Sequence, residues 1–128
     1  MKLLLDTHAL LWWLDGDERL SEPSRSAIGD ASTRVIVSAA SAWEIATKVR
    51  IGKLPGATDV AERFGEIINE QDFDPLPISV EHARQAGLLP GEHRDPFDRM
   101  LIAQSQIEGL TLVSNETLFD RFGIRRLW

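Results

Sequence analysis

Short apolar segments alternate with amphipathic stretches along the chain, and this alternation restricts the fold more than any other feature. Three segments have the composition of buried strands: Lys2–Leu5, Arg34–Ser38 and Leu110–Val113. Two more suit the edge of a sheet: Phe73–Ile78, which contains two prolines, and the short Ile124–Leu127. Strands separated by helical segments are typical of parallel sheets, so the sequence predicts an α/β domain with a central, mostly parallel sheet.

The segments between the strands carry start and stop signals of helices. Helices are predicted from Ser21 to about Ala31, from Ser41 to about Ile51, over Asp59–Asn69, from Ser79 to Leu88, and from Asp95 to about Glu108. Gly109 is a typical helix stop, and Ser21 with Pro23 is a typical start. We find no internal repeat and no linker, so we expect one domain over residues 1–128.

The segment from Ala9 to Leu14, which contains Trp12 and Trp13, is apolar on every side. A helix of this kind must be covered on all faces. Two interpretations stay open: a core helix of a small domain, or a helix with one face, at Trp12 or Trp13, covered by a second subunit or another protein.

Charge and composition exclude several classes of protein. The 128 residues carry a formal net charge of −6 and contain no cysteine, which rules out disulfides, thiolate metal sites and cysteine nucleophiles. Acidity argues against a module that holds nucleic acid through phosphate contacts alone, but a nuclease with carboxylate metal ligands is compatible with it. Asp6 interrupts the apolar start, and no apolar run is long enough for a membrane span, so we expect a soluble cytoplasmic protein.

Acidic residues follow the predicted strands at the points where ligands bind in parallel sheets. Five of them lie just after a strand, or at the start of a helix that leads into one: Asp6, Glu44, Asp95, Asp98 and Glu116. Because the carboxyl ends of parallel strands meet at one edge of the sheet, we expect these acids to gather there.

Each acid taken alone also has an ordinary structural interpretation. Asp6 and Asp95 stand where N-caps are common. Glu44, three residues after Ser41, matches a capping box. The two remaining acids suit the positive end of a helix dipole. A cap needs only one acid for each helix, however, so five acids directed to one edge favour a shared site.

Clustered carboxylates repel one another unless a cation neutralises them, and oxygen ligands select Mg²⁺ or Mn²⁺. Such ions hold a phosphodiester and activate water. The three histidines, His8, His82 and His93, lack ligand spacing, and we interpret them as packing or surface residues, with His93 near the site through Asp95. Neither a glycine-rich phosphate loop nor a G-x-S-x-G nucleophile motif is present.

Four long motifs in a fixed order resemble the PIN-domain ribonucleases, and in particular the VapC-type toxins of bacterial toxin–antitoxin pairs. They are L-L-L-D-T-H-A-L-L-W-W at residues 3–13, V-S-A-A-S-A-W-E-I-A-T-K at 37–48, H-R-D-P-F-D-R-M-L-I-A-Q at 93–104 and G-L-T-L-V-S at 109–114. The ending I-R-R-L-W is also similar to this family.

The resemblance implies an α/β/α sandwich with a carboxylate site for Mg²⁺ or Mn²⁺. The family's first two acids fall on Asp6 and Glu44, and the third falls on Asp98, with Asp95 as a neighbour that shares the metal. Glu116 stands where the family usually has an aspartate, and Ser114 where a hydroxyl residue is common. The resemblance also implies a cognate antitoxin and a homodimer.

From these residues and this resemblance we expect a metal-dependent endoribonuclease that acts as a toxin. Candidate phosphate contacts are Lys48, Arg50, Lys53, Arg94 and Arg99, each of which is otherwise a solvated surface charge. One alternative is a phosphohydrolase with Asp6 as nucleophile, although His8 stands where such enzymes carry a second aspartate. The other alternative is a non-catalytic protein that keeps the fold and only binds a partner.

Overall fold

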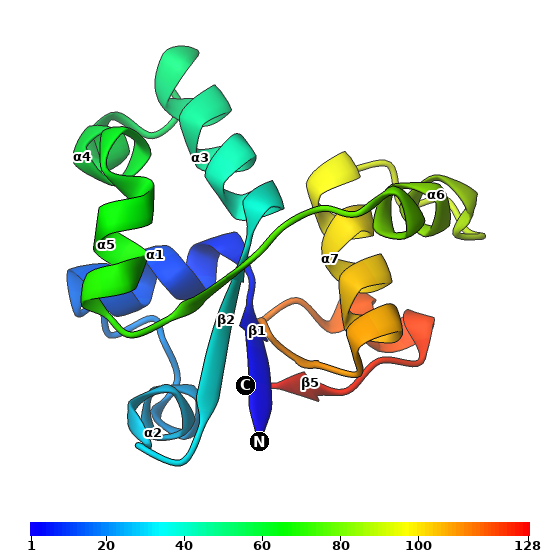
Figure 1. Ribbon diagram of the computed structural model, residues 1–128, viewed down its shortest axis with the longest axis horizontal. Coiled ribbons are helices and arrows are strands. Elements are labelled where there is room, and N and C mark those ends of the chain that lie inside the picture. Colours follow the sequence, from blue (N-terminus) through cyan, green and yellow to red (C-terminus); the bar gives the residue numbers. More distant parts are fainter.

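The computed structural model describes residues 1–128, and its centre is a sheet of five parallel strands in the order β3-β2-β1-β4-β5 (Figure 1). The strands are β1 (Lys2–Leu5), β2 (Arg34–Ser38), β3 (Asp74–Leu76), β4 (Thr111–Val113) and β5 (Arg126–Leu127). The predicted parallel sheet is confirmed. The two segments predicted as edge strands do form the edges, and both are shorter than predicted.

Helices cover both faces of the sheet, which gives the expected three-layer α/β/α sandwich (Figure 1). On one side lie α1 (Thr7–Asp15), α2 (Glu22–Gly29), α4 (Thr58–Glu62) and α5 (Phe64–Glu70), with the short helix η1 (Pro55–Ala57). On the other side lie α6 (Val80–Leu88), α7 (Pro96–Glu108) and the 3₁₀ helix η2 (Thr117–Phe122). Helix α3 (Ala39–Arg50) extends beyond the end of β2.

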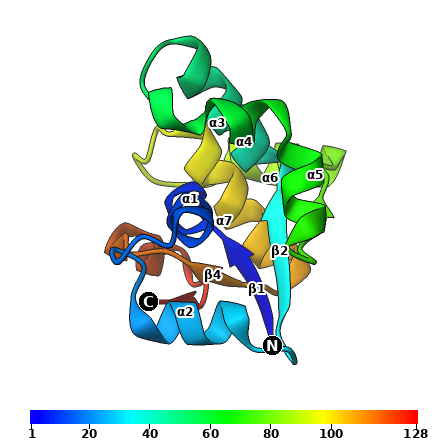
Figure 2. The same ribbon diagram turned by 90° about the vertical axis from the view of Figure 1, so that its left-hand side faces the viewer.

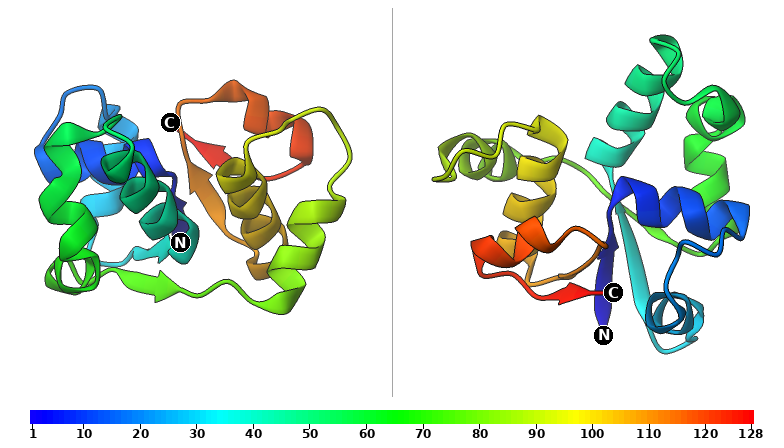
Figure 3. Two further views of the ribbon diagram at one scale, coloured as in Figure 1. Left: turned by 90° about the horizontal axis from the view of Figure 1, so that it is seen from above. Right: turned by 180° about the vertical axis from the view of Figure 1, so that it is seen from behind.

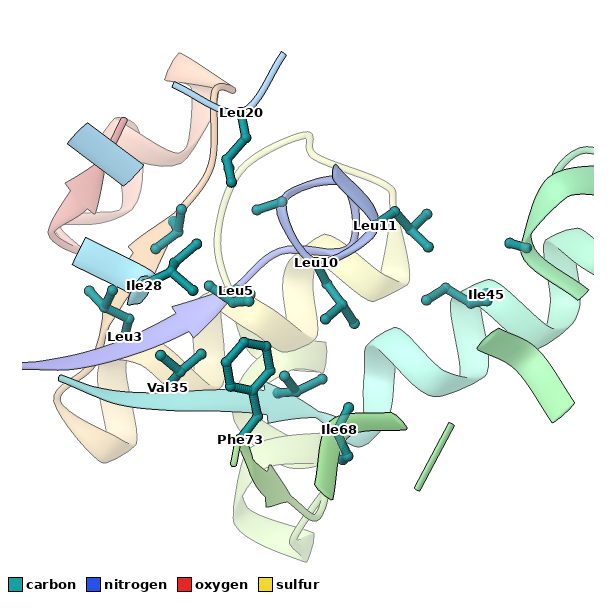
Figure 4. Packing of buried hydrophobic residues seen from close by; sticks show 14 residues of the cluster. Leu3, Leu5, Leu10, Leu11, Leu20, Ile28, Val35, Ile45, Ile68 and Phe73 are labelled. Atoms are coloured by element: carbon teal, nitrogen blue, oxygen red, sulfur yellow. The ribbon is translucent and has the colours of Figure 1, made fainter. Parts of the chain in front are cut away.

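The alternation of side chains along β1 divides the core in two. Leu3 and Leu5 point to one face, where they pack with Leu10 of α1 and Ile68 of α5 (Figure 4). Leu4 points to the opposite face and joins a second cluster with α7 and η2. All three leucines are fully buried, which explains why this strand is an uninterrupted apolar run.

Two predicted helices differ from the structure. Helix α3 begins at Ala39 rather than Ser41, because the hydroxyl of Ser38 accepts a hydrogen bond from the backbone N–H of Ala40 at 2.9 Å and caps the helix. The predicted helix over residues 59–69 is interrupted at Arg63, whose backbone leaves the helical region just before Gly65.

All five strands run in one direction, so their carboxyl ends form a single edge of the sheet (Figure 2). Helix α1 begins directly after β1, and α3 directly after β2. The view down on this edge shows α3 and α7 side by side above the sheet (Figure 3, left). None of the helices has the length and hydropathy needed to cross a bilayer.

Candidate active site

Asp6 is the most deeply placed acid at this edge. It follows β1 directly and is only 6% exposed. Its Oδ1 accepts a hydrogen bond from the backbone N–H of Ala9 at 2.8 Å, so Asp6 is the N-cap of α1, as its position suggested. Ser114, at the end of β4, also hydrogen-bonds to this carboxylate. The cap and the serine fix the orientation of the Asp6 carboxylate at the centre of the sheet edge.

Glu44 lies on the inner face of α3 and is also 6% exposed. The Thr7 hydroxyl donates to its Oε1 at 2.6 Å, and the Lys48 ammonium donates to its Oε2 at 2.6 Å. The capping-box interpretation of Glu44 is wrong, because Ser41 lies inside the helix and is fully buried. Thr7 directly follows Asp6, so its hydrogen bond to Glu44 joins the helix that begins after β1 to the helix that begins after β2.

Asp95 and Asp98 open α7 and have different roles. The Oδ1 atom of Asp95 accepts from the backbone N–H groups of Phe97 and Asp98, at 2.9 and 3.1 Å, so Asp95 is the N-cap. Asp98 is free of this task, and its Oδ2 lies 2.9 Å from Nε2 of His93. Asp95 is therefore occupied by its helix, whereas the Asp98 side chain is directed to the site.

Glu116 immediately precedes η2 and makes no side-chain capping bond. Its backbone N–H donates to the hydroxyl of the fully buried Ser114 at 3.1 Å. Ser114 thus joins the Asp6 carboxylate to the Glu116 backbone. Glu116 is half-buried and stands at the N-cap position of η2, so its contacts are also compatible with an ordinary helix-start acid, and its part in the site stays a prediction.

The electrostatic coupling among these side chains places them in one neighbourhood. Burial raises the pKa of Asp6; the Ser114 and Ala9 hydrogen bonds oppose this rise, and the charge of Glu116 adds to it. Burial likewise raises the pKa of Asp98 to about 6; the His93 hydrogen bond opposes the rise, and the charges of Asp95 and Glu116 add to it. The charge of Glu116 thus acts on the carboxyl groups of both Asp6 and Asp98.

Lys48 is the main positive charge beside the cluster. Partial burial alone would lower its pKa, but the hydrogen bond and charge of Glu44 raise it, and the charges of Asp95 and Asp98 add to the rise. The other three acids form no ion pair: Asp6, Asp95 and Glu116. Negative charge at this edge therefore exceeds the positive charge that the chain itself supplies.

The donor set consists of carboxylate oxygens, which is the chemistry that Mg²⁺ and Mn²⁺ prefer. A buried carboxylate such as Asp6, with a raised pKa and no basic partner, is a group that a cation would stabilise. No three of the histidine and acidic side chains, however, converge closely enough to hold a metal ion as they stand. The residues fit a divalent cation in kind, but the site is not preassembled.

Residues 3–124 match the PIN domain family. The chain belongs to this family. The match covers all five acids of the sheet edge and every strand except β5, so the family is defined on the same part of the chain that forms the candidate site.

A relative of known name and several solved structures are similar to this PIN domain. Ribonuclease VapC16 of Mycobacterium tuberculosis is 38% identical over 63 residues, which are 49% of this chain and 43% of that protein. The chain thus spans less than half the length of that curated relative. VapBC2 from Rickettsia felis, solved with a DNA fragment from its promoter, has a TM-score of 0.66 at 14% identity, over 99% of this chain and 98% of the other. VapBC-1 from nontypeable Haemophilus influenzae has a TM-score of 0.66 at 12% identity, over 99% and 97%. At these identities the structures establish the fold.

Of the basic residues considered for phosphate binding, Arg99 is bonded to the backbone of this PIN domain, and the other four remain at least partly exposed. Arg99 donates to the carbonyl oxygens of Ala86, Gly87, Leu89 and His93, so its four bonds join α7 to the last turn of α6 and to the loop between the two helices. Since a guanidinium has only five N–H donors, Arg99 has a structural role in place of the expected phosphate contact. Lys48 is half-buried, and the side chains at 50, 53 and 94 are exposed.

Ser114, which the resemblance offered as a residue to orient a carboxylate or a water and as a candidate substrate contact, is fully buried, and this favours the orienting role over direct contact with substrate. Trp12 and Trp13 are half-buried against the core. The Trp13 indole N–H donates to Gln71 at 3.0 Å, and Arg19 lies 5.1 Å above the Trp12 ring. Packing against the core of the same chain therefore buries a large part of both indole rings.

Sequence reasoning missed the partners that hold the acids in place. The spacing of Glu44 and Lys48, four residues apart on one helix, is a recognisable ion-pair signal, yet Lys48 was considered only for phosphate. His93 was connected to Asp95, but the structure pairs it with Asp98. Thr7 carried no signal beyond its position after Asp6, because its contact with Glu44 spans 37 residues of sequence.

Proposed function

We propose that this PIN domain is a Mg²⁺- or Mn²⁺-dependent endoribonuclease that acts as the toxin of a toxin–antitoxin pair. The observation that carries the proposal is the excess of carboxylates at the carboxyl edge of the sheet, where Asp6 is buried without a basic partner. The name of the ribonuclease relative and the toxin–antitoxin complexes among the similar structures support the same function.

Asp6, Glu44 and Asp98 would hold the metal, with Glu116 completing the site and Asp95 beside it. The bound ion would supply charge neutralisation for the phosphodiester and would activate water. Thr7 and Ser114 orient the carboxylates of Glu44 and Asp6, which keeps their oxygens directed to the site. These two hydroxyls have no other evident chemical role.

The Lys48 ammonium pairs with the carboxylate of Glu44, and the His93 ring is hydrogen-bonded to that of Asp98, so both acids have partners within the chain. With a cation held by Glu44, the Lys48 ammonium would be available to contact a phosphate oxygen of the RNA. The exposed Arg94, on the loop before Asp95, supplies a second positive charge at the same rim. This arrangement lets an acidic protein bind a polyanion locally.

A cognate antitoxin would bury the remaining exposed surface of Trp12. Beside this ring runs a groove of about 280 Å³, whose lining includes His8, Leu11, Leu54 and Val60. A basic antitoxin side chain that enters the carboxylate cluster would compete with the metal and stop cleavage. We also propose that the toxin is a homodimer and acts in the cytoplasm, where its RNA substrate is found.

Cleavage of an unstructured RNA with Mn²⁺, and again with excess EDTA, tests the proposal. We expect cleavage with Mn²⁺ and none with EDTA. Cleavage that persists in EDTA would contradict the metal dependence, and hydrolysis of small phosphomonoesters in place of RNA would favour the phosphohydrolase alternative. A folded protein without either activity would favour the non-catalytic alternative.

A further inference from the structure

An exposed tryptophan stands at the rim of the carboxylate site. Trp43 is on α3, one residue before Glu44, and is 57% exposed. Phe97 is on α7, one residue before Asp98, and the ring centroids of Trp43 and Phe97 are 4.8 Å apart at an interplanar angle of 77°. Each of these two aromatic residues therefore immediately precedes a candidate metal ligand, and together they join α3 to α7.

The contact between the two rings does not explain why Trp43 is exposed. An edge-to-face contact orients an indole but covers only a small part of it, so most of the ring stays in contact with water. The α3 residues on the same exposed face are Ala39, Ala46 and Arg50, which are small or charged. Trp43 is thus an isolated aromatic ring and not the centre of a broad apolar patch of the kind that large protein interfaces need.

The surroundings of Trp43 have the two features by which proteins bind single-stranded RNA, namely an aromatic ring on which a base stacks and nearby positive charges for the backbone. Lys48 lies on the same helix, and Arg94 lies on the loop that leads to Phe97. Lys48 is bonded to Glu44, and Arg94 directly precedes Asp95 in the sequence, in a chain whose net charge is −6. Their position at this rim favours a nucleic acid strand as the occupant.

We propose that Trp43, held in place by Phe97, stacks on an unpaired nucleobase next to the phosphodiester that is cleaved. Only one sugar separates a base from its phosphate, so a base on Trp43 keeps the backbone near Glu44 and Asp98. Stacking on an indole accepts any base, whereas paired bases in a duplex are not free to stack. The platform therefore selects single-stranded RNA without selecting a sequence. This inference rests on the proposed ribonuclease function.

Kinetics of the Trp43→Ala and Trp43→Phe variants with a short unstructured RNA and Mn²⁺ test the platform. Stacking that is equal in the ground state and the transition state changes KM and leaves kcat unaltered. We expect Trp43→Ala to raise KM on the order of tenfold, with kcat nearly unchanged, and Trp43→Phe to retain most of the affinity. Val80→Ala is the matched control, because Val80 is an exposed apolar residue on α6, and it should leave KM unchanged.

Fluorescence gives a readout that does not depend on cleavage. The other three tryptophans are half-buried, so a single-stranded phosphorothioate RNA that resists cleavage, added with Mg²⁺, should quench mainly Trp43, and the quench should be lost in Trp43→Phe. If the Trp43→Ala variant is active and its KM is unchanged, the stacking platform is wrong. If the same variant also turns a dimer into a monomer, Trp43 belongs to a subunit interface instead. Wild-type protein that fails to cleave RNA would instead count against the proposed function, and absence of the quench would then overturn the platform as well.

Discussion

The charged side chains at the two ends of the sheet differ in how completely they are paired. At the amino end, the arginines that begin β2 and β5 each have a partner, and Lys2 of β1 is exposed to solvent: Arg34 of β2 lies 2.6 Å from Asp74 of β3, and Arg126 of β5 lies 2.9 Å from Asp120 of η2. At the carboxyl end, acids outnumber their partners, and Asp6 is buried without a basic one.

This difference separates residues that serve the fold from residues that serve a function. Exposed ion pairs such as Arg34–Asp74 contribute little, about 0–1 kcal/mol, and need no further ligand. Carboxylates that raise one another's pKa oppose folding, and such groups cluster where a protein binds or reacts. The carboxyl end therefore carries, near neutral pH, an electrostatic cost that a bound cation would remove.

Loss of the buried carboxylate at the carboxyl end should have the largest effect. Asp6→Asn keeps a cap for α1 but removes the negative charge at the centre of the site. We expect RNA cleavage with Mn²⁺ to fall on the order of 100-fold or more, as measured by single-turnover kinetics. Asp74→Asn, at the amino end, is the matched control, and equal loss of activity in both variants would remove the distinction between the two ends.

The second prediction concerns the pH dependence of stability in the metal-free protein. Burial raises the pKa of Asp98 to about 6, so the fold favours its protonated form, and this favourable contribution is lost as pH rises from about 4 through 6. The Asp98→Asn variant carries no such charge. Its free energy of unfolding relative to wild type should therefore increase by on the order of 2 kcal/mol between pH 4 and pH 7.

Urea unfolding of both proteins at a series of pH values measures this difference. Asp120→Asn provides the control, because the pKa of Asp120 is lowered by its hydrogen bond with Arg126, so the sign of its pH dependence is opposite. If the difference in free energy of unfolding between Asp98→Asn and wild type stayed constant across the pH range, ionisation of Asp98 would not destabilise the fold, and the prediction would be wrong.

The third prediction tests Glu116, the position at which the chain departs from the family's usual aspartate. Its charge raises the pKa of both Asp6 and Asp98, so we expect it to share the cation. Glu116→Gln should slow cleavage on the order of tenfold, whereas Glu116→Asp should remain active with an altered preference between Mg²⁺ and Mn²⁺. Wild-type rates in the Gln variant would limit the site to the other acids.

The smallest effect is expected at the amino end. Asp74→Asn removes the carboxylate that accepts from Arg34, and both side chains are about half exposed. The free energy of unfolding should decrease by less than about 1 kcal/mol, and added salt should reduce this difference further. Chemical unfolding at low and high ionic strength measures it. A decrease of several kcal/mol in the free energy of unfolding would mean that the Arg34–Asp74 ion pair stabilises the fold substantially, which contradicts the comparison.

The sequence predicted the sheet because its strands are continuous apolar runs with clear boundaries. It also predicted that acids follow the strands at one edge, and Asp6 does follow β1 while Glu44 lies on the helix after β2; that these acids form one site stays a prediction. The start of α3 was misplaced by two residues, since Ser38 and Ser41 are equally good caps in sequence and only the end of β2 decides between them.

The contacts that tune the acids could not be predicted in the same way. Hydrogen bonds such as Thr7 to Glu44 join residues far apart in sequence and depend on the packing of α1 against α3. The exposure of Trp43 could not be predicted for a similar reason, because the amphipathic α3 does not by itself show which of its faces meets a neighbour. Only the position of α7 beside α3 shows that its ring stays at the surface.

Thermal unfolding with and without millimolar Mn²⁺ tests the central claim most directly, namely that the acids of the carboxyl end form one cation site. A ligand that binds only the folded state must raise its stability by mass action. We predict that Mn²⁺ raises the Tm of the wild-type protein and of Asp74→Asn equally, and that Asp6→Asn and Asp98→Asn lose most of this increase. A wild-type Tm unaffected by Mn²⁺ and Mg²⁺, or an increase that survives in Asp6→Asn, would contradict the account.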